Sequence, residues 1–321
     1  MTTFADIQIQ QATPTHKFLE EMNQTLPWQL FETILKTHIH HKPNGRPPYK
    51  RLLLLKMNLL KIWFNLSYEQ TEFQCHDRLS FRKFLGFSLE SPIPEATTLE
   101  NFQHELQNTP AQEALFLALD TFFQENNLIL KEGNLVDATF IKANSKQRKK
   151  PEDQSDPDAT YGYKGFGYSA TVNVDAKSKL IRKVVVTGAN VHDSQSLLPV
   201  LVGYEQTVGA DSGYVGKEKD LKALGIQPRI IKRRVRGKQH EPTPELTASQ
   251  KRFNGLVSKI RARVEHVFAG WKTVFKKVRV SCRGLVRVSA EILGLAFGYN
   301  CRRYGFLVRR GVGFSGFLYG F

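Results

Sequence analysis

The chain has 321 residues, 41% of them hydrophobic, so it is long enough to bury one large core or two ordinary ones. Its formal charge of +16 favours a polyanionic partner and says little about the fold. Three widely spaced cysteines exclude a disulfide framework and a zinc-type motif, and with no signal-peptide pattern and no run of ~18 apolar residues we expect a cytoplasmic protein without a membrane partner.

Residues 1–127 predict a helical domain. Apolar residues recur at helical spacing in the segments 30–37, 49–64, 67–75, 98–106 and 111–125. Ser67 and Gln70 have the spacing of a capping box, which is a start signal for a helix. A basic cluster that begins at Arg46 precedes the Leu-rich second segment. This cluster fits a DNA contact or the solvated end of a core helix, and both interpretations stay open.

From Asn134 the pattern changes to short apolar runs bounded by turn residues. We expect strands at 135–139, 168–174, 180–187, 207–210 and 228–231, with helices at 194–202 and 217–224. A strand, a hairpin, a crossover helix and further strands predict an α/β domain, residues 128–304, with a mixed sheet flanked by helices. The Gly- and Phe-rich tail, residues 305–321, has no functional interpretation.

Positive charge is concentrated around a further predicted helix, residues 249–277. Residues 229–287 hold 17 Lys or Arg and three acids, a net charge of +14. Within the helix, Arg261, Glu265 and Lys272 follow the spacing R-x3-E-x6-K. At 100° per residue, Glu265 lies about 40° and Lys272 about 20° around from Arg261, so all three share one face. One carboxylate between two cations suits a site for both metal and phosphate.

Two aspartates upstream complete a set of three acids. Asp137 and Asp211 each close a short apolar run of the kind that forms a buried strand. Three carboxylates suffice to hold two Mg²⁺ ions roughly 3.5–4 Å apart, which activate the attacking oxygen and stabilise the leaving oxygen of a phosphodiester; Mn²⁺ is a possible substitute. Arg261 and Lys272 would then hold backbone phosphates.

Each of these residues also has a structural interpretation. An Asp at a strand end is commonly a turn former or a helix cap. Glu265 and Arg261 also fit an ordinary i, i+4 helix pair, worth only ~0.3–0.5 kcal/mol. The conjunction favours a catalytic site, because acids on two strands and a helix fall in order within a strongly basic part of the chain.

These segments resemble DDE transposases of bacterial insertion sequences, in the family numbered five and related to the one numbered four. That family's signature is an Arg four positions before the catalytic Glu and a Lys seven after it. The segments around Asp137, His192 and Asp211 are similar to its other blocks, and the resemblance runs from about Tyr49 to Gly298. It implies a ribonuclease-H-like core, with Asp137, Asp211 and Glu265 as catalytic metal ligands, and a preceding helical domain.

Two departures from the family pattern affect the DNA contacts. The signature often has a Tyr three positions before the Arg, where this chain has Ser258, so a tyrosine contact to DNA is not expected here. Asp211 and Glu265 are 54 residues apart, too close for the large β insertion of some relatives. Trp271 is then the nearest aromatic residue able to stack on a displaced base, although it fits equally a core position of the helix.

Further candidates for DNA contacts lie elsewhere in the α/β half. His192 follows a strand and is placed to orient water or the scissile phosphate, while we interpret Asp193 as the cap of the next helix. Lys164, just before the predicted hairpin, fits a DNA contact near Asp137 or a solvated lysine. We expect a basic run to bind phosphates, with a solvated loop as the alternative; its members are Lys232, Arg233, Arg234 and Arg236.

The sequence therefore predicts a DNA transposase that binds terminal inverted repeats and carries out cut-and-paste transposition. It would cut double-stranded DNA at the element ends and join the resulting 3′-hydroxyl to target DNA at one Mg²⁺ site. Because two ends must be paired, we expect a homodimer on DNA, associated with the nucleoid. Two alternatives stay open: a catalytically silent DNA-binding relic, and a metal-dependent nuclease without strand transfer.

Overall fold

The computed structural model describes residues 13–40, 49–129, 133–146, 148, 153–234 and 245–311. The chain forms two compact units, one from Met1–Leu119 with Phe297–Phe321 and one from Asp120–Ala296. The first unit therefore takes in the C-terminal end of the chain, which the sequence analysis divided at 304/305. Arg46, Arg236 and residues 312–321 lie outside the described residues.

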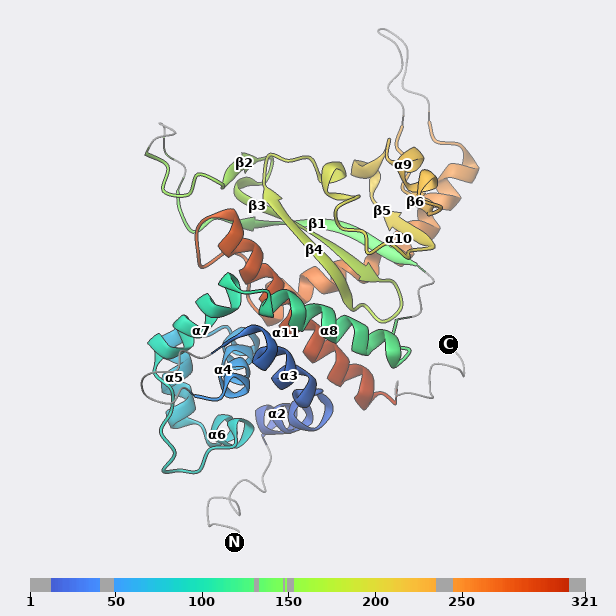
Figure 1. Ribbon diagram of the computed structural model, residues 1–321. Helices are drawn as coiled ribbons and strands as arrows, with labels where there is room; N and C mark the ends of the chain where they lie inside the picture. The colour runs from blue at the N-terminus through green and yellow to red at the C-terminus, as the bar shows by residue number, and fades with distance from the viewer. Residues whose placement is uncertain are drawn as a thin grey trace. The chain divides into compact units, whose positions relative to one another are not determined.

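The first unit is helical, as predicted. It contains α2 (Pro14–Thr25), α3 (Trp28–His38), α4 (Arg51–Phe64), α5 (Tyr68–Asp77), α6 (Leu79–Leu85), α7 (Ala96–Asn108), the start of α8 (Ala111–Glu125) and the end of α11 (Leu285–Arg309) (Figure 1). The predicted capping box of Ser67 and Gln70 begins α5. The sequence analysis missed α2, α6 and α11. No helix within the described ranges has both the length and the apolar character to cross a bilayer.

Aromatic side chains form the centre of this helical unit. The Trp28 and Trp63 rings each pack against Phe84 with centroids 5.9 Å apart, and Trp63 Nε1 donates to the Gly298 carbonyl at 2.9 Å. The Lys56 ammonium lies 4.5 Å from the Trp28 ring, and burial lowers the pKa of Lys56 to about 8. Burial of large apolar rings stabilises this unit, and the half-buried Lys56 ammonium lies among them.

The second unit is built on a mixed six-stranded sheet. Its strands are β1 (Asn134–Lys142), β2 (Thr160–Gly162), β3 (Gly165–Asp175), β4 (Ile181–Gly188), β5 (Thr207–Ala210) and β6 (Gln227–Ile230). The path is β2-β3-β1-β5-β6, with β4 also paired to β3 (Figure 1). The pairs around β3 are antiparallel, whereas β1–β5 and β5–β6 are parallel. The predicted mixed α/β domain is confirmed, and all five predicted strands are present.

The two faces of the sheet have different coverings. Side chains alternate along a strand, so Val136, Val208 and Ala210 point to one face, where they form a core with Tyr214. Leu135 and Asp137 point to the other face, against which α10 (Ala248–Ala269) packs at β1 and β5. The helix predicted at 249–277 is thus shorter; a π turn, η4 (Gly270–Val274), follows it.

The predicted crossover helix at 194–202 is absent, and the described structure there is a short 3-10 turn, η2 (Asp193–Ser196). A second 3-10 turn, η3 (Ser212–Tyr214), follows β5, and α9 (Glu218–Ala223) leads to β6. The N-cap of η2 is His192, whose side chain accepts from the Ser194 amide, so the assignment of the cap to Asp193 was wrong.

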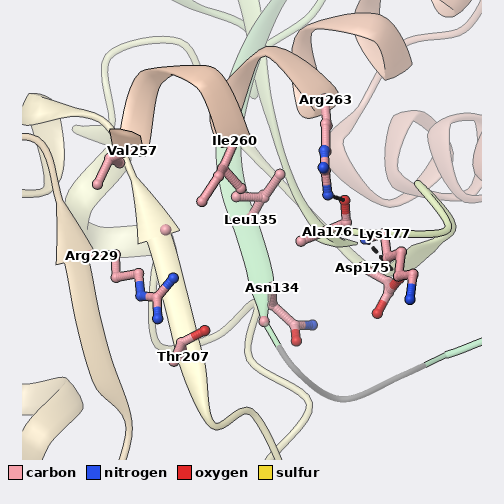
Figure 2. A pocket seen from close by; sticks show the side chains of 12 residues that line it. Asn134, Leu135, Asp175, Ala176, Lys177, Thr207, Arg229, Val257, Ile260 and Arg263 are labelled. Atoms are coloured by element: carbon pink, nitrogen blue, oxygen red, sulfur yellow. Dashed lines mark hydrogen bonds between the residues drawn. The ribbon is translucent and has the colours of Figure 1, made fainter. Parts of the chain in front are cut away.

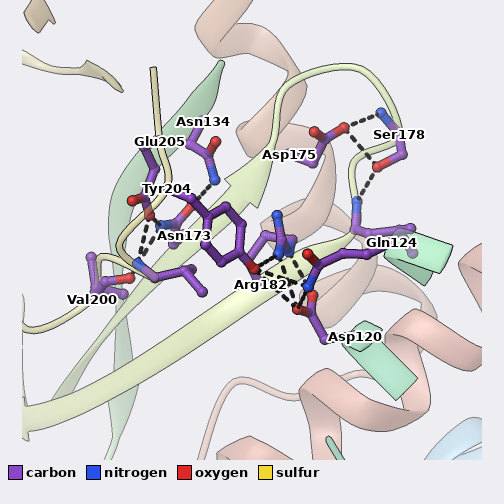
Figure 3. Close-up of polar contacts among 12 residues, drawn as sticks. Asp120, Gln124, Asn134, Asn173, Asp175, Ser178, Arg182, Val200, Tyr204 and Glu205 are labelled. Carbon is purple, nitrogen blue, oxygen red and sulfur yellow. Dashed lines mark hydrogen bonds and ion pairs between the residues drawn. The ribbon is translucent and has the colours of Figure 1, made fainter. Parts of the chain in front are cut away.

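A buried polar network attaches the end of α8 to the sheet. Arg182 of β4 donates from Nε and Nη2 to the two Asp120 oxygens at 2.5 and 2.9 Å, and Tyr204 and Gln124 join the pair (Figure 3). The Asp120 and Arg182 side chains are 5% and 1% exposed. Because both carboxylate oxygens are used, this charge pair is fully satisfied where water cannot reach it.

Candidate active site

Asp137 and Asp211 occupy matching positions on two adjacent parallel strands. Leu135 pairs with Gly209 in the β1–β5 register, and each aspartate lies two residues further along its own chain. Two residues restore the same face of a strand, so both carboxylates point to the side covered by α10. Neighbouring strands are ~4.8 Å apart, which makes the two aspartates direct neighbours. Asp137 lies in the middle of β1, which extends to Lys142, rather than at the end of the predicted run.

The turn after β5 holds the carboxylate of Asp211 in place. Asp211 is the N-cap of η3, and its Oδ1 accepts from the Gly213 amide at 2.7 Å. A Cβ atom at Gly213 would lie 2.9 Å from that oxygen, closer than real Cβ atoms come. Glycine at 213 therefore permits the close approach, and Oδ2 is left for another partner.

Helix α10 supplies a cation to this pair of acids. Arg261 Nη2 donates to Asp137 Oδ2 at 2.9 Å, and the two side chains are 13% and 15% exposed. Asp137 Oδ1 accepts from the Ala138 amide at 2.9 Å. Arg261 Nε is buried and has no hydrogen-bond partner among the described residues. Arg261 was predicted from the sequence to bind backbone phosphates, and its contact with Asp137 was not predicted.

Burial and the neighbouring carboxylate of Asp211 disfavour the charged form of Asp137. Burial raises the pKa of Asp137 and the Asp211 carboxylate adds to that rise, against the opposing effects of Arg261 and the Ala138 amide. Beneath the site, burial also raises the pKa of Tyr214, and the carboxylates of Asp193, Asp137 and Asp211 raise it further. Three carboxylates therefore lie around Tyr214, two of them side by side, and a bound cation would offset the repulsion between them.

Glu265 does not join the two aspartates. It lies one helical turn after Arg261 on α10, its side chain is exposed, and it makes no ion pair with any other described residue. From Val257 and Val264, which are buried against the sheet, helical geometry places Arg261 about 40° and Glu265 about 80° around the helix axis. Across the described ranges no three His, Cys, Asp or Glu side chains are grouped so that they could hold one metal ion.

The donor chemistry of the aspartate pair fits a hard divalent cation. Carboxylate oxygens are the ligands that Mg²⁺ prefers, and it usually takes one or two carboxylates with water and substrate oxygens. Burial and the neighbouring carboxylate keep the pKa of Asp137 raised despite Arg261, so a further cation would favour its charged form. Asp137 and Asp211 therefore suit such an ion, with Glu265 as an exposed third carboxylate on the neighbouring helix.

Two residues predicted as DNA contacts, Trp271 and Lys272, both lie in the π turn and differ in exposure. Lys272 is exposed, whereas Trp271 is 1% exposed and packs edge-on against Phe268 with ring centroids 5.9 Å apart. Trp271 thus takes the core position that the sequence analysis kept as its alternative, and neither ring face is open to a base. π turns inside helices are frequent at functional sites, and this one places Lys272 at the surface.

Lys164 and Asp193 line one small cavity beside β1. The cavity is about 110 Å³ and begins at Ala138, the residue after Asp137. Asp193 Oδ1 accepts from Ser169 Oγ at 3.3 Å, and Lys164 is exposed at the cavity's edge. His192 is exposed beside it, with Nδ1 engaged by Ser194. Lys164 therefore lies at a cavity that reaches the residue after Asp137, and its contact with DNA stays a prediction.

The basic run after β6 is anchored to α10. Asn254 holds the backbone of Lys232 with two hydrogen bonds of 2.8 Å. The Lys232 and Arg234 side chains pair with Glu218 at 3.6 Å and Glu245 at 3.5 Å, so part of their charge is neutralised. Arg233 is exposed and makes no ion pair with a described residue. The run is therefore a surface segment in which Arg233 is the freest described cation.

The structure adds cations that the sequence analysis did not name. The segment after the π turn pairs with the end of β1, since Lys142 N donates to Val278 O at 3.1 Å and Val280 N to Lys142 O at 2.9 Å. Lys142, Lys276 and Arg279 are exposed, and none of them makes an ion pair within the described part of the chain. These cations are neighbours because two segments distant in sequence pair with each other. In the sequence, only the high density of Lys and Arg around this helix indicated them.

Two families of known proteins match the chain. Residues 130–301 match a family described as Transposase DDE domain, which covers more than half of the chain. Residues 7–105 match a family described as Transposase domain (DUF772). No solved structure matches the chain. The first match contains Asp137, Asp211 and Glu265, and the second lies within the helical part that precedes the sheet.

Proposed function

The chain belongs to the family with a transposase DDE domain and is a transposase, and from this premise we propose that it cuts element ends and joins them to target DNA. It binds terminal inverted repeats and acts by metal-dependent strand cleavage and strand transfer. The observation that carries the proposal is the register that sets Asp137 beside Asp211 on one face of the sheet. The two neighbouring carboxylates, one of them with its pKa raised mainly by burial, support a cation as part of the active protein.

Asp137, Asp211 and Glu265 would hold the divalent ions, Mg²⁺ or Mn²⁺. When bound, such ions lower the pKa of water and offset charge on the phosphate and the leaving oxygen. Asp211 keeps one carboxylate oxygen free of hydrogen bonds to described residues, and Glu265 is exposed one turn beyond Arg261. Arg261 holds Asp137 in the free protein and has a buried Nε without a partner, so it can also donate to a phosphate.

The DNA strand would follow the exposed cations around the π turn. Lys272, Lys276, Arg279 and Lys142 lie on consecutive or paired segments and make no ion pairs among described residues. Phosphates are attracted to such unneutralised cations, and their binding releases counterions. Lys164, on the other side of Asp137, and Arg233, beyond β6, are the further proposed contacts. His192 is proposed to face the scissile phosphate.

The finer assignments are proposals of the same kind. A meander of antiparallel strands continued by parallel β5 and β6, with a helix across one face, supports a ribonuclease-H-like core. The R-x3-E-x6-K spacing supports membership of insertion-sequence family five, related to family four. Because transposition pairs two DNA ends, we also propose a homodimer on DNA.

The experiment compares the purified protein with a Glu265→Gln variant on labelled DNA carrying the element's own ends. With Mg²⁺ or Mn²⁺ we expect nicking at the element boundary by the parent protein, none in EDTA, and none by the variant. Both proteins should bind the DNA equally at low salt. Lys272→Gln is the matched variant, for which we expect weaker binding and a shallower salt dependence but retained nicking at saturating protein.

The alternatives predict different products. Salt-sensitive binding without nicking in any metal would identify a DNA-binding relic. Nicking without joining of a pre-cut end to target DNA would identify a nuclease. Equal nicking by the Glu265→Gln variant would reject Glu265 as a ligand, while leaving the two aspartates to be tested in the same assay.

A further inference from the structure

A cavity of about 220 Å³ lies beneath α10, on the other side of that helix from Arg261 and Glu265. The start of β1, the β3–β4 turn, β5, β6 and the helix surround it (Figure 2). Figure 2 shows Ile260 projecting from α10 toward Leu135, which forms the apolar floor; Val257 of the same helix also lines the cavity. All of these residues belong to the second unit.

A glycine accounts for the space above β5. Gly209 lies between Leu135 of β1 and Arg229 of β6 in the sheet register, and it presents no side chain to α10. A Cβ atom there would lie 2.9 Å from Leu135 Cδ2. The floor is thus closely packed, and the hollow is open between Arg229 on one side and the helix on the other.

The walls of the cavity are cationic. Arg229 and Arg263 reach it from opposite sides of Leu135 (Figure 2), and Lys177 lines the β3–β4 turn. Arg263 Nη1 donates to the Ala176 carbonyl at 2.8 Å, which fixes the guanidinium and leaves its other donors available. Arg229 is exposed and makes no ion pair with any described residue.

The single acid in the cavity wall is already satisfied. Asp175 is 1% exposed, and its Oδ2 accepts from the Ser178 amide and the Ser178 hydroxyl, both at 2.7 Å, and from the Lys177 amide at 3.1 Å. These bonds hold the β3–β4 turn and do not neutralise the arginines. The cavity therefore combines an apolar floor with two guanidinium groups that make no ion pair with a described residue.

We propose that this cavity binds a phosphate group together with the sugar or base attached to it. Guanidinium groups recognise phosphate through paired N–H donors, and Arg229 and Arg263 offer such donors at two sides of the cavity. The apolar floor suits a sugar or base, and the volume lies below that of pockets for drug-sized ligands, so it admits a phosphate with part of the attached nucleoside. The phosphate belongs to DNA or to a free nucleotide; only the DNA source rests on the proposed transposition.

The test uses the full chain with three probes: inorganic phosphate, a deoxynucleoside 5′-monophosphate and a short duplex. Binding of the first two is followed by phosphorus NMR line broadening and by the rise in melting temperature. We expect Arg229→Gln and Arg263→Gln each to weaken phosphate and mononucleotide binding at least about tenfold. Arg252→Gln is the matched control, since Arg252 is an exposed arginine of α10 outside the cavity, and it should bind like the parent protein.

A filling variant separates the two sources of phosphate. Ile260→Phe reduces the cavity without changing any charge. If it weakens duplex and mononucleotide binding in parallel, the occupant is a DNA phosphate; if it weakens only the mononucleotide, the occupant is a free nucleotide. Asp137→Asn should keep phosphate binding here even where DNA cleavage is lost, so failure of the catalytic proposal is seen separately. Unchanged phosphate binding in both arginine variants, or an equal loss in Arg252→Gln, would overturn the site.

Discussion

The second unit contains two buried Asp–Arg pairs that differ in how fully their hydrogen bonds are satisfied. Arg182 contacts both oxygens of Asp120 at 2.5 and 2.9 Å, and Tyr204 completes the group (Figure 3). Arg261 makes one contact of 2.9 Å with Asp137, and its Nε has no partner among the described residues. In the first pair both carboxylate oxygens accept hydrogen bonds from the arginine. In the second pair one arginine nitrogen has no acceptor among the described residues.

The surroundings of the two pairs differ in the same sense. Asp137 has a second carboxylate, Asp211, as its neighbour, and burial together with that charge raises the pKa of Asp137. Arg261 and the Ala138 amide oppose that rise without cancelling it. In a site that binds a further cation, the free protein can hold a carboxylate whose charged form is unfavourable, because the bound cation stabilises it. The contrast therefore distinguishes an anchor of the fold from a binding position.

Removal of Asp120 gives the largest expected change in stability. Asp120→Ala leaves Arg182 buried without its partner, so we expect the free energy of unfolding to fall by about 3–5 kcal/mol. Urea unfolding of the whole chain measures this loss. Glu245→Ala is the matched control, because Glu245 pairs with Lys251 at the exposed surface and should contribute ~0–1 kcal/mol. Equal losses in the two variants would mean that the Asp120 pair does not anchor the sheet.

Gly213→Ala tests the position of Asp211. The added Cβ would lie 2.9 Å from Asp211 Oδ1 and displace the carboxylate from its seat. We expect element-end cleavage to slow by about 10–100-fold, since displacement of a catalytic group by ~1 Å has that effect. Gly255→Ala is the control, because its Cβ meets nothing within 4 Å and should leave cleavage unchanged. A Gly213→Ala variant with full activity at the same metal concentration would argue against Asp211 as a ligand.

Asp137→Asn should increase stability at neutral pH. The folded pKa of Asp137 lies above its unfolded value, so the folded protein binds the extra proton between the two values and loses stability as pH rises through that window. The cost is absent below the unfolded pKa of about 3.9 and complete above the folded pKa. Urea unfolding should therefore show the variant gaining stability over the parent as the pH rises above the unfolded pKa, and keeping that gain at pH 7.

Asp120→Asn is the comparison for that measurement. It weakens a satisfied pair, so it should lose stability at pH 7 where Asp137→Asn gains it. A loss of stability at pH 7 in Asp137→Asn would mean that Arg261 compensates the charge of Asp137 fully, and the distinction between the two pairs would fail.

Local pattern was sufficient for much of the fold. Strand β5 and helix α8 have the predicted limits, because an apolar run between turn residues and a long apolar face are strong signals. The missed helix α11 contains glycines at 298 and 305, which disfavour helices in isolation. In the first unit a Cβ at these positions would meet Ile62 at 2.8 Å and Met22 at 2.1 Å, so close packing selects the glycines. The preference for glycine at these positions comes from tertiary packing, so no local sequence pattern predicts it.

The residues of the candidate site could be predicted from local pattern, but the contacts between them could not. Asp137 and Asp211 were identified from their strands, and the register now explains why they are neighbours. The partner of Arg261 could not be predicted, since helical spacing indicated Glu265 and the fold supplies Asp137, 124 residues away. Lys272 was assigned to a regular helix, but the π turn begins before it. Contacts between distant segments, and changes of helix type, are decided by packing rather than by spacing.

Lys56 extends the comparison to a buried cation that has no acid beside it. Its ammonium donates to Asn23 Oδ1 at 2.8 Å, and burial lowers its pKa to about 8. Between that value and the unfolded value of about 10.4 the unfolded chain binds more protons, so stability should rise with pH across this window. Lys56→Met removes the charge and should abolish the rise while it preserves the packing against Trp28. Urea unfolding at pH 7.5 and pH 10, followed by tryptophan fluorescence, measures both slopes. If the stability of the parent protein did not rise with pH, the aromatic rings and Asn23 would satisfy the ammonium as fully as Asp120 satisfies Arg182. A buried cation would then not require an acid as its partner.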